Sequence, residues 1–178
     1  MFCKNCGSEV GNDVVFCPKC GKPTSNEKGV KPLGMKWFKF IIYVQLILAF
    51  FINLLGAYIV LSGNLYFDGT TNITQSVYRM MPNLRFVDIC YAVACILLAV
   101  FSVYVRQQLV NYKQQAKYFY ILFLALNLGF SLVYKFAVYL VSDINTVDIL
   151  FLITVIENVL LIFINNIYFK KREHLFVN

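Results

Sequence analysis

Two pairs of cysteines near the N-terminus have the spacing of a metal site. In each pair two residues separate the thiols, and both pairs fall within the first 21 residues; the four cysteines are Cys3, Cys6, Cys17 and Cys20. Each pair presents two thiolates from one tight turn, and two pairs supply the four soft ligands of a tetrahedral zinc ion. The spacing therefore predicts one Zn²⁺ held by four cysteines.

A glycine follows each pair, Gly7 after the first and Gly21 after the second. Because glycine has no Cβ, it takes a positive φ without a clash, and the backbone curls so that its amides face the sulfur atoms. Between the pairs, residues 11–13 have turn chemistry and residues 14–16 form a short β-prone run. These features predict a zinc ribbon with short β knuckles over residues 1–24.

The same four thiols allow two other interpretations. They would also accept iron, or would form two disulfides in an oxidising compartment. Zinc is favoured because closed four-cysteine sites are typical of structural zinc. Four cysteines leave no open coordination position, so we expect the metal to be structural rather than catalytic. About 20 residues bury too little surface to fold alone, so metal binding supplies the folding energy of this segment.

The segment resembles the zinc-ribbon family found at the N-terminus of many bacterial membrane proteins. That family has C-x-x-C-G, a polar turn, and a hydrophobic residue just before a second C-x-x-C-G; here Phe16 precedes Cys17-Pro18-Lys19-Cys20-Gly21. The resemblance covers residues 2 to about 22. Beyond it, the chain looks like zinc-ribbon multi-pass membrane proteins of bacteria in its architecture and its basic C-terminal tail. This second resemblance implies no known activity.

The charge of the ribbon argues against nucleic acid as a partner. Three lysines, two acidic residues and a formal −2 for a zinc tetrathiolate leave residues 1–24 with a net charge of −1. A polyanion needs a basic surface. We therefore expect the ribbon to contact protein.

The rest of the chain has the composition of a membrane protein. It is 60% hydrophobic and 14% charged over all 178 residues. Four apolar runs are long enough to cross a bilayer, which takes about 20 helical residues. We predict an all-α membrane bundle of four transmembrane helices at about 38–62, 86–105, 118–141 and 148–169. The expected divisions are the ribbon at 1–24, a flexible linker at 25–37, the helix domain at 38–172 and a cytoplasmic tail at 173–178.

The basic residues predict the orientation. Thirteen of the 16 lysines and arginines precede the first helix, lie between the second and third, or follow the fourth. Because basic loops stay cytoplasmic, we expect a multi-pass protein of the cell membrane with both termini in the cytosol and residues 63–86 and 142–147 outside. Basic groups beside the bilayer also attract anionic lipids.

Two charges fall well inside the predicted spans, away from their ends: Lys135 in the third and Glu157 in the fourth. A lone charge within a membrane needs a partner or water. The two helices are antiparallel neighbours, and the depths of the two residues differ by roughly 5 Å at helical rise. We expect an intramembrane ion pair. The alternative is that Lys135 reaches the outer interface while Glu157 is protonated or bonded to an asparagine.

The leading functional hypothesis is a non-enzymatic membrane protein that presents a cytosolic zinc ribbon to a cytosolic or membrane protein partner. The sequence has no P-loop, no nucleophile elbow and no H-E-x-x-H motif, and His174 is its one histidine. A small oligomeric transporter or channel using Glu157 and Lys135 is the alternative, and it implies a homo-oligomer. A membrane-tethered zinc or thiol sensor is a third hypothesis, because oxidation of the four cysteines would release the metal.

Overall fold

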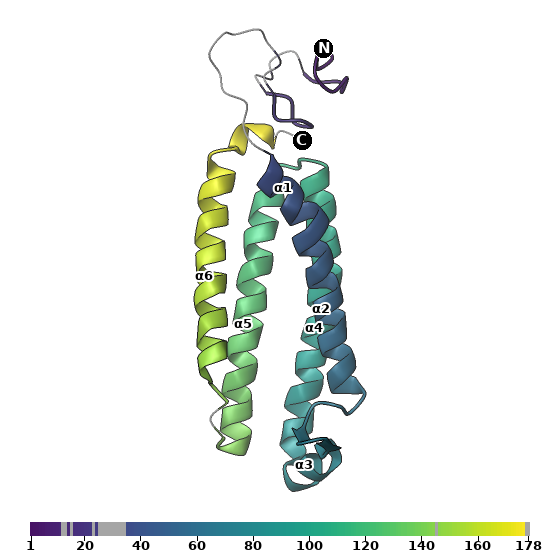
Figure 1. The fold of residues 1–178 in the computed structure, drawn as a ribbon, viewed down its shortest axis with the longest axis vertical. Helices are drawn as coiled ribbons and strands as arrows, with labels where there is room; N and C mark the ends of the chain where they lie inside the picture. The colour runs from purple at the N-terminus through teal and green to yellow at the C-terminus, as the bar shows by residue number, and fades with distance from the viewer. Residues whose placement is uncertain (12–13, 15, 23, 25–34, 145, 177–178) are drawn as a thin grey trace.

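Four long helices dominate the structure, a computed structural model that describes residues 1–178 except 12–13, 15, 23, 25–34, 145 and 177–178. Each is long and apolar enough to cross a membrane, and together they make the chain a multi-pass membrane protein. Their bounds are Lys36–Leu61, Pro82–Val110, Ala116–Ser142 and Ile149–Lys170. The ribbon stands at one end of the helices, the ribbon end, and the described C-terminus lies at the same end (Figure 1).

The first helix is built from three parts: α1 (Lys36–Phe40), the π-helical turn η1 (Ile41–Gln45) and α2 (Leu46–Leu61). A π-turn shifts the carbonyls out of their usual register. Here the Ile42 carbonyl accepts a hydrogen bond from Arg106 Nε at 3.1 Å. The Gln45 side chain accepts one from the hydroxyl of Tyr120 at 2.8 Å. The π-turn thus joins the first helix to the next two.

The second long helix, α4 (Pro82–Val110), extends well beyond the predicted 86–105. Its 29 residues span roughly 44 Å, more than the hydrocarbon core of about 30 Å. The prediction stopped at charged residues, but the helix continues through them because its ends stand outside the hydrocarbon. Pro82 occupies the first turn, where its missing N–H costs no helical hydrogen bond. The helix Lys36–Leu61 likewise takes in two residues of the predicted linker 25–37, the rest of which lies largely outside the described residues.

The remaining long helices are α5 (Ala116–Ser142) and α6 (Ile149–Lys170). Two aspartates shape the turn between them. Asp143 adopts a left-handed conformation at the end of α5, and Asp148 caps α6 by accepting a hydrogen bond from the Phe151 amide at 2.8 Å. The two helices are therefore antiparallel, as the sequence predicted.

Helix α4 packs along α2 on one side and α5 on the other, and α6 packs mainly along α5. Small residues allow the α2–α4 contact: Cys95 and Ala99 are buried on α4, and a Cβ on Gly56 of α2 would lie 3.9 Å from Cys95 Sγ. In Figure 1, α5 and α6 stand on one side, α2 and α4 on the other. Helix α6 is mostly exposed: in its most apolar stretch, only 6% is buried inside the structure.

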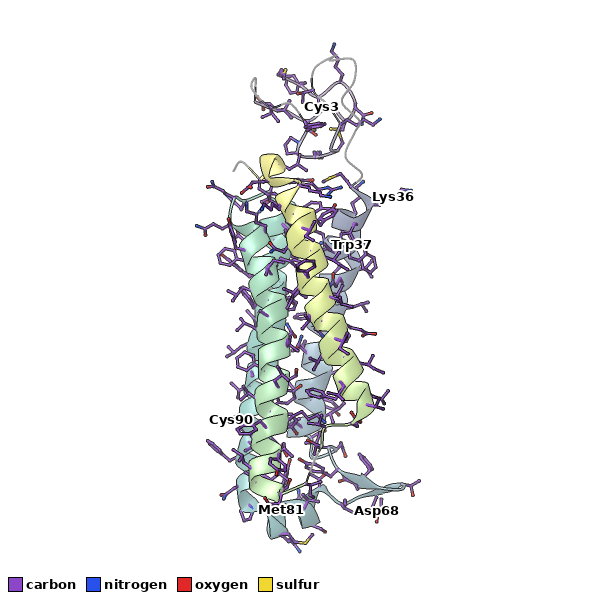
Figure 2. All side chains as sticks on the ribbon, turned by 90° about the vertical axis from the view of Figure 1, so that its left-hand side faces the viewer. Cys3, Lys36, Trp37, Asp68, Met81 and Cys90 are labelled. Carbon is purple, nitrogen blue, oxygen red and sulfur yellow. The ribbon has the colours of Figure 1, made fainter. Side chains whose placement is uncertain are left out.

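Aromatic rings join the helices at the ribbon end. We call this group the aromatic cap, and its members are Phe38, Tyr112, Tyr120, Phe169 and Phe176. Phe169 is 2% exposed and lies 5.5 Å from Tyr120 and 5.7 Å from Phe176, between ring centroids. Nearby, Trp37 Nε1 donates to Asn165 Oδ1 at 2.9 Å and links the first helix to α6. Figure 2 places Trp37 at this end of the bundle.

The predicted tail contributes to this cap. Residues Glu173–Leu175 form the short 3₁₀-helix η2, which brings Leu175 and Phe176 into contact with the cap. Leu175 is 1% exposed and Phe176 is 5% exposed. Their apolar side chains lose water contact there, which draws the chain back onto the bundle. Leu175 and Phe176, within the predicted tail, therefore pack against the helix bundle.

A compact segment closes the end opposite the ribbon, which we call the outer end because the sequence predicts that it lies outside the cell. It holds the strands β1 (Phe67–Asp68) and β2 (Thr71–Asn72), which pair as an antiparallel hairpin, and the helix α3 (Thr74–Met80). Gly69 turns the hairpin with a φ of +60°. Figure 2 shows Asp68 and Met81 at this end, far from Cys3 of the ribbon. We call residues 62–81 the outer cap.

Candidate metal centre

The two cysteine knuckles have the same backbone geometry. In the first, the Gly7 amide donates to the Cys3 carbonyl at 2.9 Å and the Cys3 amide donates to the Ser8 carbonyl at 2.8 Å. In the second, the Gly21 amide donates to the Cys17 carbonyl at 2.8 Å and the Cys17 amide donates to the Lys22 carbonyl at 2.7 Å. Each knuckle is thus a closed turn that holds two thiols on its inner side.

The two glycines make these turns possible. Gly7 has a φ of +70° and Gly21 a φ of +71°, a region that L-residues with a Cβ seldom occupy. A Cβ on Gly7 would have no atom within 4 Å, so space is not what requires glycine there. Backbone conformation alone requires it, in agreement with the role predicted from the sequence.

The four predicted ligands come together. The sulfur atoms of Cys3, Cys6, Cys17 and Cys20 lie within 4.8 Å of one another. Two of the distances are 3.7 Å, between Cys3 Sγ and Cys20 Sγ, and 3.5 Å, between Cys6 Sγ and Cys17 Sγ. Zn–S bonds of about 2.3 Å in a tetrahedron separate the sulfurs by about 3.8 Å. The cluster therefore has the size that zinc requires.

The surroundings of the thiols differ across the cluster. Cys17 is fully buried, and burial raises the pKa of its thiol to about 12. Cys6 faces solvent, and hydrogen bonds with Ser8 lower the pKa of its thiol to about 6. Zinc binds thiolates, so loading the site displaces a proton from Cys17, and metal affinity falls as the pH falls.

The ribbon contacts the end of the helix bundle. Phe16, the hydrophobic residue before the second knuckle, packs against the cluster that contains the aromatic cap. Tyr112, in the turn between α4 and α5, lies near the second knuckle. Burial, followed by the charges of nearby groups that include Cys17 and Cys20, raises the pKa of Tyr112 to about 12. The structure thus places the metal centre against the cap rather than away from it.

A second polar cluster lies under the outer cap, and the sequence did not reveal it. Asp88 of α4 is completely buried and accepts hydrogen bonds from three tyrosine hydroxyls: Tyr66 at 3.0 Å, Tyr78 at 2.9 Å and Tyr134 at 2.9 Å. Tyr66 and Tyr78 belong to the outer cap, while Tyr134 belongs to α5. We call these four residues the tyrosine–carboxylate cluster. It joins the outer cap to two helices through one carboxylate.

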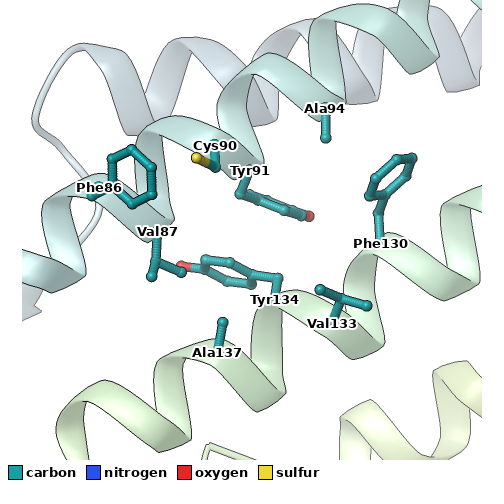
Figure 3. Close-up of a pocket in the computed structure, with 9 residues that line it drawn as sticks. All are labelled: Phe86, Val87, Cys90, Tyr91, Ala94, Phe130, Val133, Tyr134 and Ala137. Atoms are coloured by element: carbon teal, nitrogen blue, oxygen red, sulfur yellow. The ribbon is translucent and has the colours of Figure 1, made fainter.

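A cavity of about 240 Å³ lies beside this cluster, between α4 and α5 (Figure 3). Tyr91 and Tyr134 stack there with their ring centroids 4.1 Å apart. The walls are almost entirely apolar, and the Tyr134 hydroxyl is already bound to Asp88. The cavity thus offers hydrocarbon contact rather than groups for chemistry.

The structure does not form the predicted ion pair between Lys135 and Glu157. The Lys135 ammonium donates to the Thr146 carbonyl at 3.0 Å and lies 5.4 Å from the centre of the Phe151 ring. Glu157 is exposed on α6. Among the described residues, the ion pair that forms is Lys117 with Glu173. A similar depth did not bring the two side chains together, because the long Lys135 side chain reaches the turn between α5 and α6 instead.

Comparison with known proteins supports the metal centre. Residues 2–24 match the zinc-ribbon domain family. No curated protein and no solved structure matched the chain. The family match and the four-cysteine cluster agree on the same residues. The chain thus carries a zinc-ribbon domain over residues 2–24 and four helices beyond it that are long and apolar enough to cross a membrane.

Proposed function

We propose that this chain is a non-enzymatic integral membrane protein that presents a zinc ribbon to a protein partner in the cytosol or membrane. The closed cysteine cluster carries the proposal. Four thiols converge on one point, so a bound ion has all its ligands from protein and no position for a substrate. Such a site stabilises a small surface rather than performing chemistry.

The ribbon has an exposed apolar surface beside its first ligand. Phe2 is 70% exposed and Met1 is 45% exposed, although both are large and apolar. Phe2 is held in place by a β-bridge to Glu9, next to the rigid knuckle. An exposed aromatic side chain on a rigid turn is a typical anchor for a protein contact. The net charge of −1 over residues 1–24 favours protein over nucleic acid.

The test compares co-purification from cells by the full chain and by single variants. Phe2→Ser removes the anchor without touching a ligand, so it should lose the partner while its zinc content stays unchanged. Met80→Ser is the matched control, since Met80 is 73% exposed in the outer cap, and it should keep the partner. Recovery of the same partner by a chain lacking residues 1–24 would overturn the proposal.

We also propose that the protein lies in the cell membrane with both of its termini in the cytosol. The basic residues at the ribbon end support it. Thr70, in the hairpin, and Lys113, between α4 and α5, are both exposed and lie at opposite ends. In a chain with Cys90 and Cys95 replaced by serine, a membrane-impermeant maleimide added to intact cells should label Thr70→Cys and not Lys113→Cys. The reverse pattern would refute the orientation.

Transport by an oligomer is the second candidate function, and one observation favours it. Glu157 is exposed near the middle of α6, a helix that packs mainly along α5. A carboxyl group facing outward within a membrane needs a polar partner from another chain or a water-filled path. Ion flux into vesicles of purified protein should then fall with Glu157→Gln and stay unchanged with Thr154→Ala, one turn away. Equal flux in the wild type, in Glu157→Gln and in empty vesicles would exclude transport.

A further inference from the structure

A polar pocket opens between α5 and α6 at the ribbon end. Its volume is about 190 Å³, room for about six water molecules. The first turns of α5 supply Lys117, Tyr118 and Ile121, and the last turns of α6 supply Asn166, Phe169 and Lys170; Glu173 of η2 completes the wall. Because these helices begin and end here, the pocket lies at the level where the bilayer meets water.

Lys117 is the central cation of this pocket. Its side chain is 11% exposed, and its ammonium lies 4.8 Å from the centre of the Tyr118 ring. It occupies the first turn of α5, where the helix dipole disfavours a positive charge and favours an anion. Lys170, at the end of α6, also lines the pocket and brings a second positive charge to it. The pocket therefore holds two cations at a position that attracts negative charge.

Glu173 supplies the anion that Lys117 contacts. The carboxylate is bound to the Lys117 ammonium, and this contact lowers the pKa of Glu173. Yet the Glu173 side chain is 64% exposed and sits on a helical turn of three residues. An exposed carboxylate on so short an element is easily exchanged for another anion. Glu173 thus occupies the place of an anionic ligand without being fixed there by burial.

The lower wall of the pocket is apolar. Ile121 lies one helical turn further along the bundle than Lys117, and Phe169, the residue before Lys170, completes the apolar lining. A ligand that fits both parts has an anionic head beside a hydrocarbon chain. Lipids with a phosphodiester head and acyl chains have that chemistry, and basic pockets between helices at this level are suited to them.

We propose that this pocket binds the headgroup of an anionic phospholipid. The phosphodiester would lie between Lys117 and Lys170, and the part of an acyl chain nearest the headgroup would lie against Ile121 and Phe169. Glu173 competes with the lipid for Lys117. The pocket lies in the helix domain and operates without the partner of the ribbon.

The experiment measures binding of fluorescent phosphatidylglycerol to the purified full chain in neutral detergent, with phosphatidylcholine and inorganic phosphate as comparisons. Phosphatidylglycerol should bind about 25-fold tighter than phosphatidylcholine, since two lysines contribute about fivefold each. Lys117→Gln and Lys170→Gln should each weaken binding about fivefold. Glu173→Gln, which removes the competing carboxylate, should tighten it about threefold or more.

Lys113→Gln is the matched control, because it removes the same charge from the same end without lining the pocket; its affinity should stay within about twofold of wild type. Equal losses of lipid affinity in Lys113→Gln and Lys117→Gln would show that the lipid is attracted by the overall positive charge and not by the pocket, which would overturn the proposal. Inorganic phosphate that displaces the lipid at millimolar concentration would assign the pocket to free phosphate instead. Should Lys117→Gln fail to fold, Glu173→Gln decides alone: unchanged or weaker binding contradicts the proposal.

Discussion

The two ends of the helix bundle are held together by different chemistry. At the ribbon end, the aromatic cap packs rings from α1, α5, α6 and the C-terminal segment, and the ribbon rests against it through Phe16. At the outer end, three tyrosine hydroxyls converge on the carboxylate of Asp88. The ribbon end thus depends on shape and apolar area, and the outer end depends on directional hydrogen bonds to one charge.

The surroundings of the two ends explain why different contacts hold them together. The ribbon end faces water, so burying aromatic rings there gains from the hydrophobic effect. Asp88 lies within a membrane-spanning helix, where apolar burial gains little and an unpaired polar group is costly. The two ends should therefore respond to different perturbations.

The largest effect is expected from Phe169→Ala. Phe169 is 2% exposed and contacts rings of α1, α5 and the C-terminal segment, so its loss leaves a cavity that costs about 3–5 kcal/mol of unfolding free energy. Thermal unfolding in detergent, followed by circular dichroism, measures the change. Phe163→Ala on the same helix removes a ring that is 65% exposed and should change little. Equal losses in the two variants would mean that the aromatic cap does not hold this end.

Asp88→Asn should open the outer end with a smaller cost. The amide nitrogen cannot accept a hydrogen bond from a tyrosine, so at least one hydroxyl is left without its acceptor, at about 2–3 kcal/mol. Hydrogen exchange of amides in residues 62–81 should then speed up by about 30-fold or more, while exchange around Phe169 stays unchanged. Asp68→Asn, the same change in the exposed hairpin, is the control. Unchanged exchange in the Asp88 variant would show that the carboxylate does not fasten the outer cap.

Tyr78→Phe should have a milder effect at the same end, about 1.5 kcal/mol, because one of three hydrogen bonds is lost. Burial, followed by the hydrogen bond to Asp88, raises the pKa of Tyr78 to about 12 from an ordinary value of 10.0. Since folding raises this pKa, the stability it contributes is complete below pH 10 and is lost as the pH rises through about 12. The tyrosinate absorbance of wild type minus Tyr78→Phe should therefore titrate near pH 12, and a midpoint near 10 would contradict the buried contact.

Acid should have the smallest effect, and it acts at the ribbon end. Lys117 lowers the pKa of Glu173 below its ordinary value of 4.5. A lowered pKa contributes stability above the unfolded value, and this stability is lost as the pH falls through the folded value. Wild type and Glu173→Gln should therefore differ in unfolding temperature at pH 6 and converge below the lowered pKa. Acid also removes zinc from the ribbon, but it does so in wild type and in Glu173→Gln alike, so the difference between them does not include this effect. A difference that does not shrink at all as the pH falls from 6 through the acid range would contradict the contact.

The sequence predicted features that depend on local spacing. The four cysteines and two glycines repeat one pattern, which predicted the metal site, and the four apolar runs predicted the four long helices. Asp88 falls inside the predicted helix 86–105 and was not singled out, because a lone aspartate near the end of an apolar run shows no partner in the sequence. Its partners Tyr66, Tyr78 and Tyr134 are 22, 10 and 46 residues away, at no regular spacing, so only the fold brings them together.

The prediction for Lys135 and Glu157 shows a second limit. Helical rise gives the depth of each residue, but it does not say which way a flexible side chain turns. The structure gives Lys135 the Thr146 carbonyl instead. For the C-terminal segment the signal was present in the sequence: Leu175 and Phe176 are apolar residues after a basic run, and they pack into the ribbon end.

The central claim is a closed zinc site in the ribbon, and metal analysis of the purified full chain tests it most directly. Elemental analysis should find about one zinc per chain, and Cys17→Ser, which removes the most buried ligand, should lose it while circular dichroism shows the helices intact. Cys90→Ser is the matched control, since Cys90 is not among the clustered thiols, and it should keep its zinc. Iron in place of zinc, or the same metal content in wild type and Cys17→Ser, would contradict the account.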